Sequence, residues 1–341
     1  MEQLSNFTTL KVGGPAQKIV HAHTEDELVN FVKAADKSGE KILILGGGSN
    51  LLISDEGFAG TVIRVESKGN ALEFDACSGG MIEVSAGEDW DEFVAITIAK
   101  GFADLESLSG IPGTVGGAPI QNIGAYGHEV SETIARVKAY DRKNDEVKTF
   151  TNQECKFSYR NSVFKEENGR YVILNVTFQL RKGESSLPIT YAELAKHLSI
   201  NIGDRAPVSD VRKAVLELRG RKGMLIDSKD INSNSAGSFF VNPILSKSDA
   251  DKLPQDAPRW PQPDGRVKTS AAWLMEHAGV LKGEKFAGAQ ISSKHVLALT
   301  NSGDATAEDI IELAKIARAK VFEKFQIKLE AEVQLVGLDL N

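Results

Sequence analysis

The stretch SLSGIPGTVGGAPIQNIGAYG, from Ser107 to Gly127, carries the most information about the fold, because glycines and prolines alternate in it with apolar residues and no unit repeats. Low-complexity linkers are not built in this way. Glycine permits positive φ and lets a ligand approach the backbone amides closely. The stretch therefore predicts a shaped loop whose N–H groups face an anion such as a pyrophosphate, with a loop-rich corner between two layers as the structural alternative.

Length and composition place the chain among ordinary globular proteins. Its 341 residues, 41% of them hydrophobic and 26% charged, suffice for two or three domains. The net charge of −7 gives no attraction to nucleic acid or acidic membranes, so local cations must hold any anionic ligand. The first residues lack the pattern of a leader, and no apolar stretch reaches the ~18 residues of a membrane span. We therefore expect a cytoplasmic protein.

Cysteine and histidine usage argues against metal or disulfide chemistry. Cys77 and Cys155 are the only cysteines, they lie far apart, and neither belongs to a CxxC motif. The six histidines include no HExxH motif. The sequence thus predicts neither a disulfide framework nor a metal site.

A second glycine cluster, Gly46-Gly47-Gly48-Ser49-Asn50, lies between the predicted strands KILIL and TVIRV. A strand followed by glycines is typical of a dinucleotide-binding fold, but that fold needs a helix directly after them. The segment LLISDEGFAG is too short and too rich in glycine for such a helix. We instead expect a turn whose amides, with the Ser49 hydroxyl and the Asn50 amide, can meet a phosphate.

Hydrophobic periodicity predicts four long helices and a set of strands. The first helix starts at a capping box, Thr24 to Glu27, and the last is capped by Thr306. The other predicted helices are DWDEFVAITIAKG and SDVRKAVLELRG, and the further predicted strands are MIEVSAG, ARVKAYDR, VKTFT, YVILNVTFQLR and the closing LEAEVQLVG.

Three residues are candidates for chemistry, each with a plain structural alternative. Arg160, beside Tyr159 in CKFSYRNSVFK, is either a functional cation or a surface ion-pair partner. Ser238 in NSAGSFFVNP is either functional or a turn residue, since the GxSxG pattern of a serine nucleophile is absent. Glu332 lies on the polar side of the last strand and is either functional or merely solvated.

Cations gather in LRGRKG as Arg219, Arg221 and Lys222, with Lys229 shortly after. They either meet an anionic ligand or form the solvated end of a helix, where cations are favoured.

Taken in order, the motifs GGGSN, SGIPGTVGGAPIQNIGAYG, FSYRNSVFK, AGSFFVNP and EAEVQLVG resemble the UDP-N-acetylenolpyruvoylglucosamine reductase family over nearly the whole chain. The segment ITYAEL around Tyr191 is similar to the insertion of the type I branch, whose tyrosine closes over the substrate. One departure is Val241, where several relatives carry a lysine in SFFKNP. That departure removes a cationic contact near the substrate diphosphate and leaves the chemistry untouched.

The resemblance implies a mixed α/β and α+β chain with the FAD-binding fold of the p-cresol methylhydroxylase and vanillyl-alcohol oxidase type. It implies two FAD-binding subdomains, residues 1–66 with 326–341 and residues 67–220, and a substrate-binding α+β domain, residues 221–325. FAD is expected to bind non-covalently at Gly47, Gly48, Ser49, Asn50, Gly113, Val115, Gly116, Gly117, Ile123 and Gly124.

The implied reaction is the NADPH-dependent reduction of UDP-N-acetylenolpyruvoylglucosamine to UDP-N-acetylmuramate in peptidoglycan precursor synthesis. Hydride addition to the enolpyruvyl carbon sends negative charge into the neighbouring carboxylate, where Arg160 and a protonated Glu332 are expected to stabilise it. Ser238 is expected to deliver the proton. The residues expected to contact the substrate are Tyr159, Tyr191, Lys222, Asn242 and His295.

Two other functions stay open at this point. A flavin oxidase of the same superfamily would carry a histidine or cysteine for covalent flavin attachment, and the stretch from Ser107 to Gly127 has none. A nucleotide-sugar binding or transferring protein would use the same cations without flavin, so a colourless protein that stays colourless with FAD would favour it. We expect a monomer, because no sustained apolar surface stripe is visible.

Overall fold

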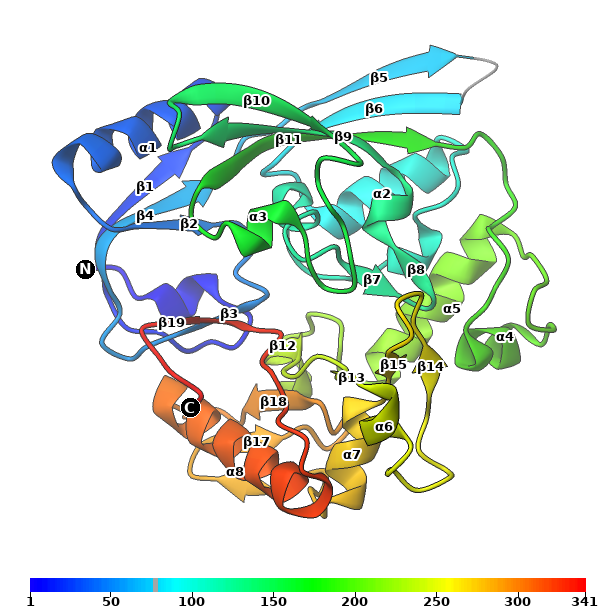
Figure 1. The fold of residues 1–341 in the computed structure, drawn as a ribbon. Coiled ribbons are helices and arrows are strands. Elements are labelled where there is room, and N and C mark those ends of the chain that lie inside the picture. The colour runs from blue at the N-terminus through cyan, green and yellow to red at the C-terminus, as the bar shows by residue number, and fades with distance from the viewer. Residues whose placement is uncertain (76–78) are drawn as a thin grey trace. The chain divides into compact units, whose positions relative to one another are not determined.

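The computed structural model describes residues 1–75 and 79–341, so Cys77 lies outside the described residues. The chain forms two compact units, whose elements are drawn in Figure 1. The first unit contains residues 16–47 and 59–221 with Met1, and the second contains residues 2–15, 48–58 and 222–341. The expected division into three domains stays a prediction.

The first unit opens with a small sheet of order β1-β4-β2, made of β1 (Ala16–Ala22), β4 (Phe58–Val65) and β2 (Ile42–Leu45), in which β2 and β4 run parallel. The helix α1 (Glu25–Ser38) contacts β1 and β2. The Thr24 hydroxyl accepts the N–H of Glu27 at its start, as the capping box predicts. No helix follows Gly46 to Asn50; β3 (Leu51–Ile53) comes next, so the rejection of a dinucleotide-binding turn is confirmed.

A larger antiparallel sheet of order β10-β9-β11-β6-β5 forms the centre of the first unit. Its strands are β5 (Asn70–Asp75), β6 (Gly79–Ser85), β9 (Ile134–Asp141), β10 (Glu146–Thr151) and β11 (Tyr171–Leu180). Figure 1 shows α2 (Trp90–Ala99) along one face of this sheet. There Trp90 and Phe93 pack on Phe178 of β11, with ring centroids 6.0 and 5.0 Å away. The predicted hairpin and helix are confirmed.

The glycine-rich stretch lies beneath this sheet as short turns. It contains the 3₁₀ helices η2 (Glu106–Leu108) and η3 (Val115–Gly117) and the two-stranded β7 (Gly124–Ala125) and β8 (His128–Glu129), followed by η4 (Val130–Glu132). The buried Gly116 N–H donates to the carbonyl of Ala86, directly after β6. The first unit ends with α3 (Val163–Glu166), α4 (Ala192–Leu198) and α5 (Val208–Arg221).

The second unit is built on an antiparallel sheet of order β12-β18-β17-β16. Its strands are β12 (Ser235–Ser238), β16 (Lys285–Phe286), β17 (Ala289–Ile291) and β18 (Ala298–Asn301), and the 3₁₀ helix η5 (Ile231–Ser233) precedes β12. The helices α7 (Ala271–His277) and α8 (Ala307–Phe325) contact each other, and α8 contacts β17 and β18. The predicted cap is confirmed, because Thr306 and Asp309 form a capping box.

The remaining elements of the second unit are small. They are η1 (Leu4–Phe7), α6 (Lys247–Ala250), a three-stranded sheet of β13 (Ile244–Leu245), β15 (Val267–Lys268) and β14 (Trp260–Pro261), and a parallel pair of β3 with β19 (Gln334–Val336).

The closing strand is shorter than predicted. The expected strand over 329–337 is a strand only from Gln334 to Val336. The preceding residues pair with a different neighbour, because Ala331 forms an isolated bridge with Phe240 before β19 joins β3. The change of partner interrupts the ladder, and periodicity along one strand does not reveal such a change.

Within residues 1–75 and 79–341, no helix is both long enough and apolar enough to cross a bilayer.

Gly116 and Gly117 offer a test of packing beneath the sheet. A Cβ on Gly116 would lie 2.6 Å from the Cβ of Ala86, whereas a Cβ on Gly117 would meet nothing nearer than 3.8 Å. We expect Gly116→Ala to lower the free energy of unfolding by about 1–3 kcal/mol or more, as overpacking does. The matched Gly117→Ala should unfold at nearly the same urea concentration as the parent protein. Equal stabilities of the two variants would contradict this packing.

Candidate functional site

Within the first unit, Gly46 and Gly47 of the second glycine cluster meet the glycine-rich stretch. A Cβ on Gly46 would lie 2.6 Å from the Thr114 hydroxyl, and a Cβ on Gly47 would lie 2.7 Å from the Cα of Gly113. No side chain fits between the clusters at these two positions. The absence of side chains brings two backbones side by side, which is the arrangement needed to hold a phosphate by its amides.

Several amides of the glycine-rich stretch are already engaged within the protein. The N–H groups of Val115, Gly116, Gly117 and Ile123 donate to the carbonyls of Glu88, Ala86, Thr114 and Ala118. These four residues therefore shape the loop, and their amides are poor candidates for cofactor donors. Gly47 and Gly113, whose backbones meet, are the better candidates for amides that bind the cofactor.

Arg160 reaches back to the glycine-rich stretch. Ser158 and Asn161 exchange two backbone hydrogen bonds, so Tyr159 and Arg160 form the tip of a tight turn, with Arg160 at φ +51°. The guanidinium donates to the carbonyl of Gly124 at 2.7 Å and lies 5.4 Å from the centre of the Tyr159 ring. Arg160 is thus held against the loop.

Asn122 is a residue of this arrangement that the sequence analysis did not single out. It is fully buried, and its amide donates to the Ser158 carbonyl and to Glu129. It therefore fastens the turn that carries Arg160 to the glycine-rich stretch. A polar side chain inside the apolar segment PIQNIG is the signal that could have pointed to it.

A hairpin turn brings Tyr126 to Tyr191. Tyr126 and Gly127 connect β7 to β8 with φ of +51° and +90°, as in a type I′ turn. The ring of Tyr126 meets that of Tyr191 edge to face, with centroids 5.4 Å apart. Burial raises the pKa of Tyr126 to about 12, so its hydroxyl stays protonated. Tyr191 itself is 42% exposed.

Of the cations in LRGRKG, Arg219 turns toward the glycine-rich stretch. Arg219 donates to the carbonyl of Gly110 at 3.0 Å, and burial lowers its pKa. Nearby, Asp91 accepts two hydrogen bonds from Arg212 and one from the N–H of Gly110. Burial opposes the charge of Asp91, but these donors hold its pKa below the ordinary value. Arg219 thus supports the glycine-rich stretch, and the solvated-end alternative is wrong for it.

His128, the first residue of β8, forms a polar contact beside the hairpin of β7 and β8. Its Nδ1 lies 2.8 Å from Glu132, and this hydrogen bond raises the pKa of the imidazole against the effect of burial. The buried Glu106 and the carbonyl of Pro188 raise that pKa further. Burial also raises the pKa of Glu106.

In the second unit, a bulge orients Ser238. Ser235 pairs with Thr300 and Ser238 pairs with Ala298, so one extra residue is inserted in β12 between these pairs. Gly237, at φ +74°, takes the left-handed conformation inside this bulge. Bulges of this kind re-aim a side chain beside an active site. The glycine before Ser238 is therefore a requirement of the bulge.

Glu332 lies on the segment next to Ser238. The N–H of Glu332 donates to the carbonyl of Phe239 at 2.8 Å, and the N–H of Val241 donates to the carbonyl of Glu330. The Asn50 amide donates to the carbonyl of Glu332 at 3.2 Å, and the Asn50 carbonyl accepts from Gln334. Three segments distant in sequence thus meet in one unit, and Glu332 is joined to two of them.

The remaining predicted contact residues also belong to the second unit, together with Gly48 and Ser49. The Asn242 side-chain oxygen accepts the N–H of Ala271 at 2.9 Å, which fixes the orientation of its amide. Lys222 directly precedes the buried Gly223, and the N–H of His295 donates to the Ser292 hydroxyl.

The fold and these motifs define an FAD-binding α/β protein. Residues 16–151 match the FAD binding domain model, and residues 229–336 match the model of the UDP-N-acetylenolpyruvoylglucosamine reductase C-terminal domain. The chain is 50% identical over 337 residues to UDP-N-acetylenolpyruvoylglucosamine reductase of Cutibacterium acnes, with 98% of this chain and 89% of the relative covered. It is 46% identical to the same protein of Thermobifida fusca, with 99% and 97% covered.

A solved structure agrees with these sequence matches. The UDP-N-acetylenolpyruvylglucosamine reductase of Thermus caldophilus superposes with a TM-score of 0.67 at 26% identity, covering 98% of this chain and 97% of that one. The chain belongs to the UDP-N-acetylenolpyruvoylglucosamine reductase family. The expected family and FAD-binding fold are confirmed.

His128 gives the stability of the first unit a defined pH dependence. The pKa of His128 is raised in the folded chain, so its protonation stabilises the fold. This contribution is fully present at pH values below 6.5, the ordinary pKa of histidine, and is lost as the pH rises through the raised pKa. Relative to His128→Gln, the parent protein should be more stable near about pH 6 and lose that advantage in alkali. Urea unfolding at several pH values measures the difference. If the stability advantage of the parent protein over His128→Gln grew with pH, the pairing of His128 with Glu132 would be contradicted. In a Glu132→Gln background, the advantage at low pH should be smaller.

Proposed function

We propose that this chain catalyses the NADPH-dependent reduction of UDP-N-acetylenolpyruvoylglucosamine to UDP-N-acetylmuramate, a step of peptidoglycan precursor synthesis, with FAD as its bound cofactor. Family membership over 98% of the chain supports the overall reaction. The observation that carries the proposed chemistry is the placement of Ser238 and Glu332 on neighbouring, hydrogen-bonded segments of one unit. A monomer working in the cytoplasm is part of the same proposal.

The residues present fit a flavin dinucleotide. Gly46 and Gly47 meet Thr114 and Gly113 at distances that exclude a side chain, which leaves backbone amides to face the pyrophosphate. Gly48, Ser49 and Asn50 follow Gly47 in the second glycine cluster, and the Gly124 carbonyl accepts a hydrogen bond from Arg160. When bound, FAD accepts a hydride from NADPH and supplies it to the enolpyruvyl carbon.

We assign charge stabilisation to Arg160 and Glu332. Hydride addition at the terminal enolpyruvyl carbon places negative charge on the substrate carboxylate as an enolate. A fixed donor aimed at developing charge contributes about 10²–10³ in rate. The Gly124 carbonyl and the Tyr159 ring hold the Arg160 guanidinium, and the hydrogen bonds to Phe239 and from Asn50 hold the backbone of Glu332. A protonated Glu332 donates to the carboxylate.

We assign the proton to Ser238. The enolate needs one proton on its ether-bearing carbon, and a single positioned donor delivers it from one face. The bulge at Gly237 determines where the Ser238 hydroxyl points. Tyr191, Lys222, Asn242 and His295 are assigned to binding of the substrate and its diphosphate, and Tyr159 to support of the site.

Replacement of Ser238 tests the proposed reaction. Ser238→Ala should leave flavin reduction by NADPH nearly intact, because that half-reaction requires no proton from Ser238. It should slow oxidation of the reduced flavin by the enolpyruvyl substrate by at least the about 10²–10⁴-fold contributed by a positioned acid. Ser238→Cys should recover part of the rate. Stopped-flow absorbance separates the two half-reactions, and equal slowing of both would make Ser238 a turn residue.

Glu332 and Glu330 provide a matched pair two residues apart. Glu332→Ala should slow the second half-reaction by about 10²–10³-fold, the value of one donor to developing charge. Glu332→Gln keeps an N–H donor and should lose less. Glu330 is exposed on the same segment, so Glu330→Ala should react at the parent rate. Equal rates for Glu332→Ala and Glu330→Ala, measured by single-turnover absorbance, would remove Glu332 from the chemistry.

A further inference from the structure

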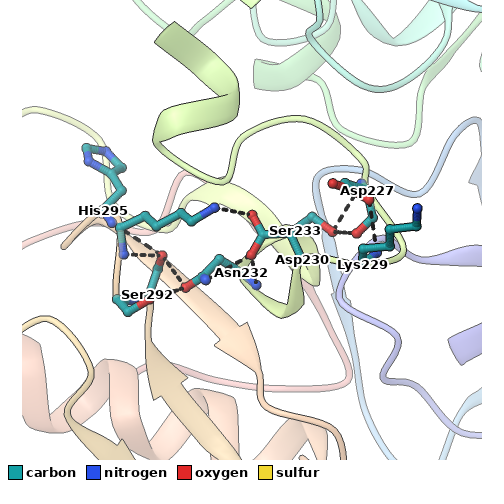
Figure 2. A network of polar contacts seen from close by, with 9 residues as sticks. Asp227, Lys229, Asp230, Asn232, Ser233, Ser292 and His295 are labelled. Atoms are coloured by element: carbon teal, nitrogen blue, oxygen red, sulfur yellow. Dashed lines mark hydrogen bonds and ion pairs between the residues drawn. The ribbon is translucent and has the colours of Figure 1, made fainter. Parts of the chain in front are cut away.

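A polar network in the second unit joins the segment 227–233 to the turn 292–295. Figure 2 shows Asp230 and Asn232 in the middle of this network, with Ser292 and His295 on one side and Asp227 and Ser233 on the other. The two sequence segments are about sixty residues apart, and the side chain of Asn232 makes the direct link between them.

Asn232 receives three hydrogen bonds on one oxygen. Its Oδ1 accepts from the Ser292 hydroxyl at 2.9 Å, from the Ser293 N–H at 2.9 Å and from the Ser293 hydroxyl at 3.1 Å. Asn232 is 7% exposed and Ser292 is fully buried. Buried polar groups must be hydrogen-bonded, so removing this acceptor would leave the donors of Ser292 and Ser293 without this partner and weaken the attachment of the turn to the segment 227–233.

Asp230 extends the same link through charge. One carboxylate oxygen accepts from the Asn232 amide at 2.9 Å, and the other pairs with the Lys294 ammonium at 2.7 Å. Burial opposes the charge of Asp230, but the hydrogen bond from Lys294 and those from Asn232 hold its pKa below the ordinary value. The turn 292–295 is therefore held twice, by the Asn232 oxygen and by the Asp230–Lys294 pair.

The network also packs against the backbone beside Lys222. A Cβ on Gly223 would lie 2.8 Å from the Cβ of Asn232 and 3.4 Å from the Cδ of Lys294. Gly223 is buried at φ +67°, a conformation and a space that suit only glycine. The backbone next to Lys222 thus packs directly on the Asn232 side chain, whose amide oxygen holds the turn that ends in His295.

We propose that Asn232 is a positioning residue for substrate binding, which locks the turn 292–295 to the segment 222–233 and so holds Lys222 and His295 at the spacing that grips the diphosphate of the nucleotide sugar. This inference rests on the proposed function of the site. The required side chain needs an oxygen for the turn and an N–H for Asp230, and asparagine supplies both. Leucine has the same branching and supplies neither, and aspartate supplies the oxygen alone.

Steady-state and single-turnover kinetics of the flavin-loaded enzyme test the proposal. Asn232→Leu should raise KM for UDP-N-acetylenolpyruvoylglucosamine by about tenfold or more, because misplaced binding groups lose interactions made equally in the ground and transition states. The turnover number and flavin reduction by NADPH should change little. Asn232→Asp should restore only part of the affinity, because it keeps the oxygen for the turn but sets a second carboxylate against Asp230, where the Asn232 amide donates.

Ser233→Ala is the matched control, because it removes a hydroxyl that donates to the Asp227 carbonyl and accepts from the Asp227 N–H in the same segment, and it leaves the link to the turn intact. It should keep the parent KM. If Asn232→Leu does not fold, Ser293→Ala, which removes one of the three donors to Asn232, should still raise KM by a smaller factor.

Two results would overturn the positioning role. One is an Asn232→Leu enzyme with a lowered melting temperature but an unchanged KM. The other is an equal rise in KM for Asn232→Leu and Ser233→Ala, which would make general loop stability the cause. A different result would overturn the proposed function: the enolpyruvyl substrate would fail to oxidise the reduced flavin of the parent enzyme. This measurement needs no variant, so the two failures are distinguishable.

Discussion

The pairing of the last segment of the chain organises the second unit. Residues 330–332 pair with residues 239–241, and β19 then pairs in parallel with β3. The Asn50 side chain bonds to the carbonyl of Glu332 where the partners change. Because an antiparallel and a parallel ladder meet on one short segment, Glu332 has little freedom. The same hydrogen bonds hold Phe239, the neighbour of the proposed acid Ser238, and Asn50, the last residue of the second glycine cluster.

The first unit depends on the absence of side chains. The backbones at Gly47 and Gly113 approach too closely for a Cβ, and Gly116 packs on Ala86 in the same way. The N–H groups of Val115 and Gly116 donate to the carbonyls of Glu88 and Ala86, and these hydrogen bonds stabilise the loop. Arg160 and Arg219 then donate to carbonyls of the loop at Gly124 and Gly110. The backbone of the loop is thus held in shape by half-buried arginine side chains that come from outside the loop.

Local sequence signals predicted the regular elements well. The caps at Thr24 and Thr306, the hairpin of β9 and β10, and the amphipathic helices α1, α2 and α8 all form where expected. The missing helix after Asn50 was also predictable, because ten residues with two glycines cannot cross a sheet. The closing strand was predicted too long, since alternation along one segment does not report a change of partner at its edge.

The sequence by itself determined the family, the cofactor class and the residue types at each candidate position, because these depend on local motifs and their order. Tertiary structure alone decided that Arg219 supports the glycine-rich stretch, that Asn122 fastens the turn carrying Arg160, and that Asn232 joins two segments sixty residues apart. Each of these roles is a hydrogen bond between groups distant in the chain. Such a bond depends on where the backbone returns, which no local pattern of residues encodes.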